Sequence, residues 1–218
     1  MYNEEDNPTL TNVTFSSNIA TYDGGGMANG NNNPTLTNVT FSDNSAGYFG
    51  GGMYNGNSSL TLTNVTFGNN SAGSLGGGMA NWSGSSAQIR NTILWDNTAA
   101  NAAQIYNDNF TSGSSVLSES VVQGGCPEGS TCTNIITTDP MLGALGNYGG
   151  FTQTIPLLAG SSAVDTGNDT VCPATDQRGV IRPQGAHCDI GAYEAVPTYY
   201  TATFNANGGE GTMAPQSA

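Results

Sequence analysis

The sequence predicts an all-β fold, a right-handed parallel β-helix of about 26 residues per coil that ends in an irregular C-terminal cap. Three observations predict it: an internal repeat of 26 residues, segments in which threonine alternates with apolar residues, and regularly placed glycines and asparagines. The composition agrees, because 36% of the 218 residues are hydrophobic and 9% charged. In globular domains nearly half of the residues are typically hydrophobic and about a quarter are charged.

Two motifs repeat with the same period. Gly-Gly-Gly-Met ends at Met27, Met53 and Met79, and Thr-Leu-Thr-Asn-Val-Thr-Phe occupies residues 9–15, 35–41 and 61–67. Weaker copies over residues 89–94 and 104–107 extend the repeat. The alternation predicts strands, because an amphipathic helix would place apolar residues at i, i+3, i+4 and i+7. One repeat therefore forms one coil, with successive coils about 4.8 Å apart and glycine at the bends.

Each coil is expected to point three apolar side chains inward, which in the first coil are Leu10, Val13 and Phe15. Their equivalents in later coils stack on them. Asparagine also recurs in columns, which we expect to form hydrogen-bonded ladders at the turns. The columns are Asn12, Asn38, Asn64 and Asn91; Asn18, Asn44, Asn70 and Asn97; and Asn29, Asn55, Asn81 and Asn107.

Three regions follow from where the repeat begins and stops. Residues 1–125 are predicted to form coils, 126–195 the final coils and a disulfide-containing cap, and 196–218 the truncated start of a following β-module. The first three residues match residues 53–55, so the chain is expected to begin mid-coil as a segment of a longer protein. An uncapped first coil predicts end-to-end self-association through its strand edges.

Four cysteines allow three pairings, of which the two local ones, Cys126 with Cys132 and Cys172 with Cys188, are favoured. A zinc site is disfavoured, because Cys-x-x-Cys spacing does not occur and His187 is the only histidine. Disulfides indicate an extracellular or cell-surface location. The acidic first six residues do not resemble a secretory signal, so no export signal is assigned to this segment.

Several motifs resemble known bacterial surface proteins. Gly-Gly-Gly-Met paired with Phe-x-x-Asn, at Phe15, Phe41 and Phe67, resembles the β-helix repeat of polymorphic outer-membrane proteins and adhesins. Over residues 139–195, the motifs Asp-Pro-Met-Leu-Gly, Ala-Val-Asp-Thr-Gly-Asn and Cys-Asp-Ile-Gly-Ala-Tyr-Glu resemble choice-of-anchor Q domain proteins. That resemblance implies a secreted or surface-displayed bacterial β-helix, held by a variable sorting device, without a defined catalytic activity. Residues 199–215 resemble the opening of a Listeria/Bacteroides-type surface repeat.

Two of the three arginines lie among acidic residues in the C-terminal segment. The predicted cluster is Asp165, Asp176, Arg178, Arg182, Asp189 and Glu194. We interpret it as salt bridges that hold the cap on the last coil. The alternative interpretation is a pocket for the carboxylate of a substrate.

Charge excludes two classes of partner. The chain has 16 acidic residues against three arginines and no lysine, which gives a formal net charge of −13. Such a surface cannot track phosphates, which excludes nucleic acid, and it has no basic cluster to attract an anionic membrane. No apolar stretch is long enough to span a bilayer, so no membrane insertion is expected in this segment.

The favoured function is non-enzymatic. We expect a secreted or cell-surface segment that serves as an adhesin or stalk, or as a scaffold that contacts a glycan or a host-cell ligand. No catalytic residue, metal ligand or cofactor is assigned, and calcium is left open. The first alternative is a pectate lyase-like enzyme acting on polysaccharide, which needs carboxylates clustered on one outward face. In the coils Asp43 and Asp96 share a column with Ser17 and Asn69, whereas Asp23 and Asp108 stand apart in the repeat.

The second alternative is an ice-binding protein. Threonines flank the inward leucines, so they are expected to form two outward columns that order water, spaced about 6.7 Å along the strand and 4.8 Å between coils. The columns comprise Thr9, Thr11, Thr35, Thr37, Thr61 and Thr63. The competing interpretation is that threonine is simply a good exposed strand residue.

Overall fold

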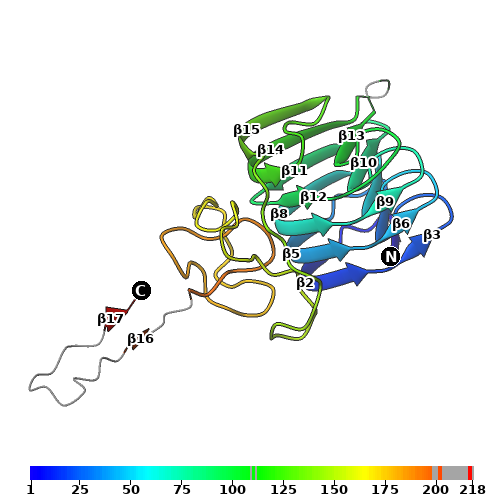
Figure 1. Ribbon diagram of the computed structural model, residues 1–218. Helices are drawn as coiled ribbons and strands as arrows, with labels where there is room; N and C mark the ends of the chain where they lie inside the picture. Colours follow the sequence, from blue (N-terminus) through cyan, green and yellow to red (C-terminus); the bar gives the residue numbers. More distant parts are fainter. Residues whose placement is uncertain (109, 111, 198–200, 203–215, 218) are drawn as a thin grey trace, which may run out of the picture.

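The computed structural model describes residues 1–108, 110, 112–197, 201–202 and 216–217. Within these residues all regular structure is strand, and nearly all strand pairing is parallel, which confirms the all-β prediction. Coils of about 26 residues stack into a β-solenoid of about five turns (Figure 1). In the described residues, no helix is long and apolar enough to cross a membrane.

Three parallel sheets form the sides of the stack. Sheet A is β1 (Tyr2–Glu4), β4 (Met27–Gly30), β7 (Met53–Gly56), β10 (Met79–Trp82) and β13 (Ile105–Asn107). Sheet B is β2 (Thr9–Ser16), β5 (Thr35–Ser42), β8 (Ser59–Gly68), β11 (Ser86–Arg90), β12 (Ile93–Trp95), β14 (Ser114–Val122) and β15 (Ser130–Ile136). Sheet C is β3 (Ile19–Ala20), β6 (Ser45–Ala46) and β9 (Ser71–Ala72).

The strand register keeps equivalent residues of successive coils opposite each other. In sheet B, Leu36 pairs with Leu62 and Phe41 with Phe67, and all four side chains are fully buried. The rings of Phe41 and Phe67 stack with centroids 4.6 Å apart. The inward stacks predicted from the repeat are therefore present, and one narrow core runs along the axis.

The triple glycines allow close approach between coils. A Cβ atom added to Gly51 would collide with the backbone carbonyls of Gly77 and Ser71 in the next coil. Gly50, just before it, has a φ of 64°, a conformation in which L side chains are strained. The bends before β4, β7 and β10 therefore depend on glycine, whereas Ala102 takes the positive φ before β13.

Two of the three predicted asparagine ladders are continuous. In the column that begins at Asn18, the Nδ2 of each amide donates to the Oδ1 of the next coil, over 2.8 to 2.9 Å. In the column that begins at Asn29, the same pattern repeats over 2.9 to 3.0 Å. The second ladder ends where the Nδ2 of Asn107 donates to the carbonyl of Glu128.

The third column, which begins at Asn12, is not a continuous ladder. Asn38 donates to Asn12 over 3.2 Å and Asn91 to Asn64 over 3.3 Å, but Asn64 turns its Nδ2 to other acceptors. These acceptors are the carbonyls of Asp189 and Gly191. The reason is that this column lies at left-handed bends, with φ between 46° and 58°, on a face that another segment covers.

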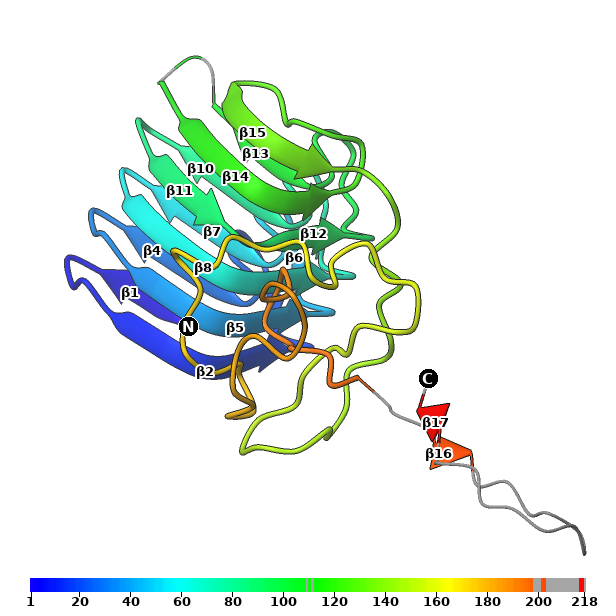
Figure 2. The same cartoon turned by 90° about the vertical axis from the view of Figure 1, so that its left-hand side faces the viewer.

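Residues 139–195, here named the lateral segment, do not cap the end of the stack. They run across the outer face of sheet B, in front of β2, β5 and β8 (Figure 2). Thr152 donates to the carbonyl of Asn12, and Asn38 donates to the carbonyl of Thr175. Because the segment bonds to successive coils from first to fourth, the expectation of an end cap is wrong, and the segment is a side cover.

The lateral segment carries little regular structure. Its chain is held by isolated antiparallel bridges, such as Leu142 with Leu157, and by side-chain hydrogen bonds. Both predicted disulfides form, Cys126 with Cys132 and Cys172 with Cys188, and two disulfides are typical of an oxidising compartment. Of the predicted C-terminal module, only β16 (Thr201–Ala202) and β17 (Gln216–Ser217) are described beyond Pro197, as an antiparallel pair.

Candidate functional site

The predicted arginine–acid cluster is a buried structural network rather than an open pocket. Arg182 is 7% exposed, and its Nη1 donates to Glu194 Oε2 over 2.7 Å. Its guanidinium also donates to the carbonyls of Asp189 and Gly191. The Glu194 carboxylate in turn accepts the backbone N–H groups of Gln184 and Asp189. The two arginines are therefore engaged inside the lateral segment, whereas Asp165 and Asp189 line a hollow of about 730 Å³ beside it.

A second ion pair, Arg178 with Asp176, belongs to the same network, because Asp176 accepts the backbone N–H of Glu194. Arg178 binds Asp176 over 2.8 Å, and its guanidinium lies 3.5 Å from the centroid of the Tyr193 ring, in a cation–π contact. Asp165 and Asp189, also predicted for the cluster, pair with no arginine side chain. Asp165 accepts the backbone N–H of His187, and Asp189 accepts those of Asp165 and Ala195. Burial raises the pKa of Asp189 to about 6.

The threonine columns exist as predicted over three coils. Thr9, Thr35 and Thr61 pair in register, as do Thr11, Thr37 and Thr63. The next coil places Gln88 and Arg90 at these positions, so the array ends there. Within the described residues, no group of three or more acidic, cysteine or histidine side chains is arranged to hold a metal ion.

The outer face of sheet A carries a surface that was not predicted. Met79 and Asn81 of β10 are buried inward, so alternation points Ala80 and Trp82 outward. Tyr54 and Tyr106 occupy the outward column of Ala80 in the neighbouring coils. This side of the solenoid is therefore rich in aromatic residues, unlike sheet B, where threonines take the equivalent place.

Five rings, three from the turns before β4 and β7 and two from sheet A, form a continuous chain along the axis, here named the aromatic surface. It consists of Tyr22, Tyr48, Phe49, Trp82 and Tyr106. Successive centroids lie 5.9, 6.2, 4.9 and 5.7 Å apart, from the first coil to the last strand of sheet A. Tyr22 is 68% exposed and Tyr48 51%, so these rings form a surface rather than part of the core.

Two carboxylates flank the aromatic surface. Asp23 occupies the position equivalent to Phe49 one coil earlier and accepts the backbone N–H of Phe49 over 3.1 Å. Asp108 follows β13 directly and is 1% exposed. The pKa of the Tyr54 phenol is raised, first by desolvation and then by the charges of Asp23 and Asp108. Burial also raises the pKa of Asp23 itself. The face combines flat rings with negative charge.

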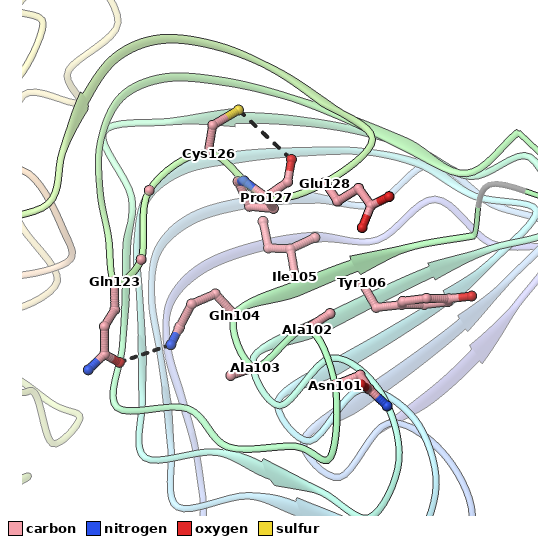
Figure 3. Close-up of a pocket in the computed structure, with 12 residues that line it drawn as sticks. Asn101, Ala102, Ala103, Gln104, Ile105, Tyr106, Gln123, Cys126, Pro127 and Glu128 are labelled. Atoms are coloured by element: carbon pink, nitrogen blue, oxygen red, sulfur yellow. Dashed lines mark hydrogen bonds between the residues drawn. The ribbon is translucent and has the colours of Figure 1, made fainter.

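At its last ring the aromatic surface meets a groove of about 380 Å³. Two segments line it, residues 101–106 and residues 123–128 (Figure 3). Tyr106 and Glu128 lie on one side of the opening, whereas Gln104 and Gln123 meet on the opposite side (Figure 3). Ring, amide and carboxylate groups thus converge around this groove.

A period-based signal for the aromatic surface was present in the sequence. Tyr22 and Tyr48 are one period apart, and Tyr54 and Tyr106 are two periods apart. They were not predicted, because the columns of threonine, asparagine and apolar residues dominate the repeat. Trp82 stands alone in its column, opposite Gly56, and had no sequence signal.

Comparison with known proteins identifies no relative: no family model, no curated protein and no solved structure matches this chain.

Proposed function

We propose that this protein is a non-enzymatic, secreted or cell-surface β-helix that acts as an adhesin-type scaffold and binds glycans on its aromatic surface. The observation that carries the proposal is the five-ring chain from Tyr22 to Tyr106 on one outward face. Exposed aromatic patches of this kind mark interaction sites, since a stable monomer gains nothing by leaving such rings in water. Sugar rings present flat C–H faces that stack on aromatic rings, and their hydroxyls donate hydrogen bonds to carboxylates.

Charge selects among glycans. Asp23 and Asp108 lie beside the surface, and the chain has a net charge of −13 with two of its three arginines engaged in the lateral segment. A uronic or sialic acid would be repelled here, because like charges at close range are unfavourable. The preferred ligand is therefore a neutral glycan. Display outside the cell agrees with the two disulfides and with the motifs similar to choice-of-anchor Q proteins.

The rigid stack supports a role in binding rather than catalysis. A mechanism of glycoside hydrolysis needs two carboxyl groups about 5 to 10 Å apart across the bond that is cleaved. Asp23 and Asp108 lie at opposite ends of the surface by coil position, in the first and fifth coils. The pectate lyase-like alternative remains a proposal that the same binding experiment tests, because cleavage would release new reducing ends.

The test is affinity electrophoresis of the protein in gels that contain neutral or anionic polysaccharides. We expect retardation by at least one neutral polymer and none by polygalacturonate. Trp82→Ala should lower the affinity at least tenfold, since Trp82 contacts two neighbouring rings and such central aromatic residues dominate interfaces. The matched control is Phe151→Ala, because Phe151 is a fully exposed ring on the lateral segment, away from the aromatic surface.

Two results would overturn the proposal. The first is free migration in every neutral polymer together with binding of polygalacturonate. The second is equal loss of affinity in Trp82→Ala and Phe151→Ala. Release of reducing ends from any polymer, with or without calcium, would instead support the enzyme.

Ice binding stays a second candidate because the threonine columns of β2, β5 and β8 are in register. Thermal hysteresis of the purified protein tests it directly. Absence of hysteresis and of recrystallisation inhibition at millimolar protein would dismiss it.

A further inference from the structure

The groove exists because sheet A stops before sheet B does. β13 is the last strand of sheet A, whereas sheet B continues through β14 and β15. After β14 the chain turns through residues 123–128, held by the Cys126–Cys132 disulfide, instead of adding another strand to sheet A. A step is left above β13, with Ile105 facing Pro127 across it (Figure 3). Its volume of about 380 Å³ lies within the usual range of small-ligand sites, about 300 to 1,000 Å³.

One side of the groove is fixed by hydrogen bonds. Gln104 Oε1 accepts from Asn97 Nδ2 over 2.7 Å, and Gln104 Nε2 donates to Gln123 Oε1 over 3.0 Å. The same Gln123 oxygen accepts the backbone N–H of Asp96. This side is the end of an asparagine ladder that runs the length of the solenoid, so it is preorganised before any ligand arrives.

The opposite side offers polar groups to a ligand. Glu128 and Asn101 are both exposed and line the groove, as does Tyr106, whose ring also packs against Trp82. Apolar contacts come from Ala102, Ala103 and Pro127. A carboxylate, an amide and apolar carbons around a small hollow suit a polyhydroxylated ring without charge.

Tyr106 belongs both to the groove and to the aromatic surface, where its centroid lies 5.7 Å from that of Trp82. A glycan chain that lies along the axis over Trp82 therefore leads directly into the groove. We infer that the groove is a terminal subsite, which receives the end sugar of a neutral glycan whose preceding sugars lie along the outward edges of Trp82 and Tyr106. This inference rests on the proposed function and adds to it recognition of a chain end.

The experiment compares chain ends with chain interiors. The probes are cellohexaose, maltohexaose and mannohexaose, measured by calorimetry, each beside a soluble polymer of the same sugar, measured by affinity electrophoresis. We expect Glu128→Gln and Asn101→Ala to weaken hexaose binding about tenfold, the loss typical of one good hydrogen bond to a charged or buried group. Binding of the polymers, whose ends are scarce, should stay within twofold of the wild type.

The matched control is Glu119→Gln, which removes the same charge from an acid on β14 that does not line the groove. It should leave both measurements unchanged. Circular dichroism and the denaturation midpoint of each variant establish that it is folded.

The outcomes separate the two proposals. If the groove variants leave hexaose binding unchanged, or weaken hexaose and polymer equally, the terminal subsite is overturned. The proposed function then survives as long as Trp82→Ala weakens both. If the wild type binds neither a hexaose nor a polymer, both proposals fail.

Discussion

The side-chain Nδ2 of Asn44 donates to Oδ1 of Asn70, one coil later, over 2.8 Å, and both side chains are fully buried. The backbone N–H of Asn44 donates to the same oxygen over 3.1 Å. Each amide of this ladder thus bonds along the solenoid axis and also satisfies a backbone group at a bend. The ladder therefore holds successive coils together in the interior, a role that a larger apolar core has in an ordinary domain.

Asn70→Ala should destabilise the protein strongly. The variant loses the Nδ2 bonds to Phe41 and Asn97, and it leaves the backbone N–H of Asn44 and one of the two Nδ2 hydrogens of Asn44 without an acceptor. Because each orphaned buried group costs about 1–3 kcal/mol, we expect the free energy of unfolding to fall by about 3 kcal/mol or more in urea. Asn18→Ala, at the exposed end of the same ladder, is the control and should cost about 1 kcal/mol. Equal losses in the two variants would contradict the ladder's structural role.

Gln177→Leu should loosen the lateral segment. The Gln177 amide is 2% exposed and donates to Thr14 Oγ1 over 2.7 Å and to Thr152 Oγ1 over 2.8 Å, while its Oε1 accepts from Thr40. Leucine keeps the volume and removes these bonds, so we expect a loss of about 2–4 kcal/mol and faster amide exchange near residue 177. Gln153→Leu is the control, because that side chain is exposed and only its backbone carbonyl is used. Unchanged exchange in Gln177→Leu would show that these bonds do not hold the segment.

Stability should depend on the ionisation of Asp189. Burial raises the pKa of its carboxyl from 3.8 to about 6, against the opposing effect of N–H groups from Ala195 and Asp165. The protonated form is therefore favoured by folding, and this contribution is present below about pH 4 and lost as pH rises through 6. We expect the wild type to lose about 2 kcal/mol between pH 4 and 7.5 relative to Asp189→Asn, which does not ionise. A constant difference between the two across this range would contradict the raised pKa.

His187 should titrate above its usual range. Its Nδ1 lies 2.8 Å from Asp169 Oδ2, and this hydrogen bond and charge raise the pKa of His187 above 6.5 and lower that of Asp169 below 3.8. The stabilising contribution of His187 is complete below pH 6.5 and is lost as pH rises through the raised pKa. In NMR titration, Asp169→Asn should return the pKa of His187 toward 6.5. Asp165→Asn should shift it less, because the Asp165 carboxylate accepts the backbone N–H of His187 and its charge is the smallest contribution to that pKa.

The fold could be predicted because the residues that recur with the period are the ones that stack on each other in successive coils. Phe41 and Phe67 lie one period apart and their rings meet, so sequence spacing translates directly into contact. The position of the lateral segment could not be predicted in the same way. Asn38 and Asn64 have the same spacing as Asn44 and Asn70, yet they bond to residues more than 120 positions away. A one-dimensional pattern does not distinguish an amide that bonds to its neighbour from one that bonds across the fold.

The candidate site was predicted less well for a related reason. Arg182 and Glu194 are two members of the six-residue cluster predicted from the sequence, which did not assign the ion pair that they form, and buried charges of this kind need partners nearby. The aromatic surface depends on Phe49, whose ring stacks on that of Trp82 in a different coil, with centroids 4.9 Å apart. That contact follows from how the glycine bend directs the chain, which spacing alone does not reveal.

The hydrogen bonds of the lateral segment have a consequence for how this protein can change over evolutionary time. A free-standing solenoid gains or loses whole repeats easily, because each unit touches only its neighbours. Here Gln177 bonds to the second coil and Gly191 to the fourth, so the spacing between these two attachment points measures the number of repeats between them. Duplication of one 26-residue unit between them would displace one anchor by a full step. The lateral segment thus fixes the number of repeats between its two attachment points. Whole repeats can be added only outside that span.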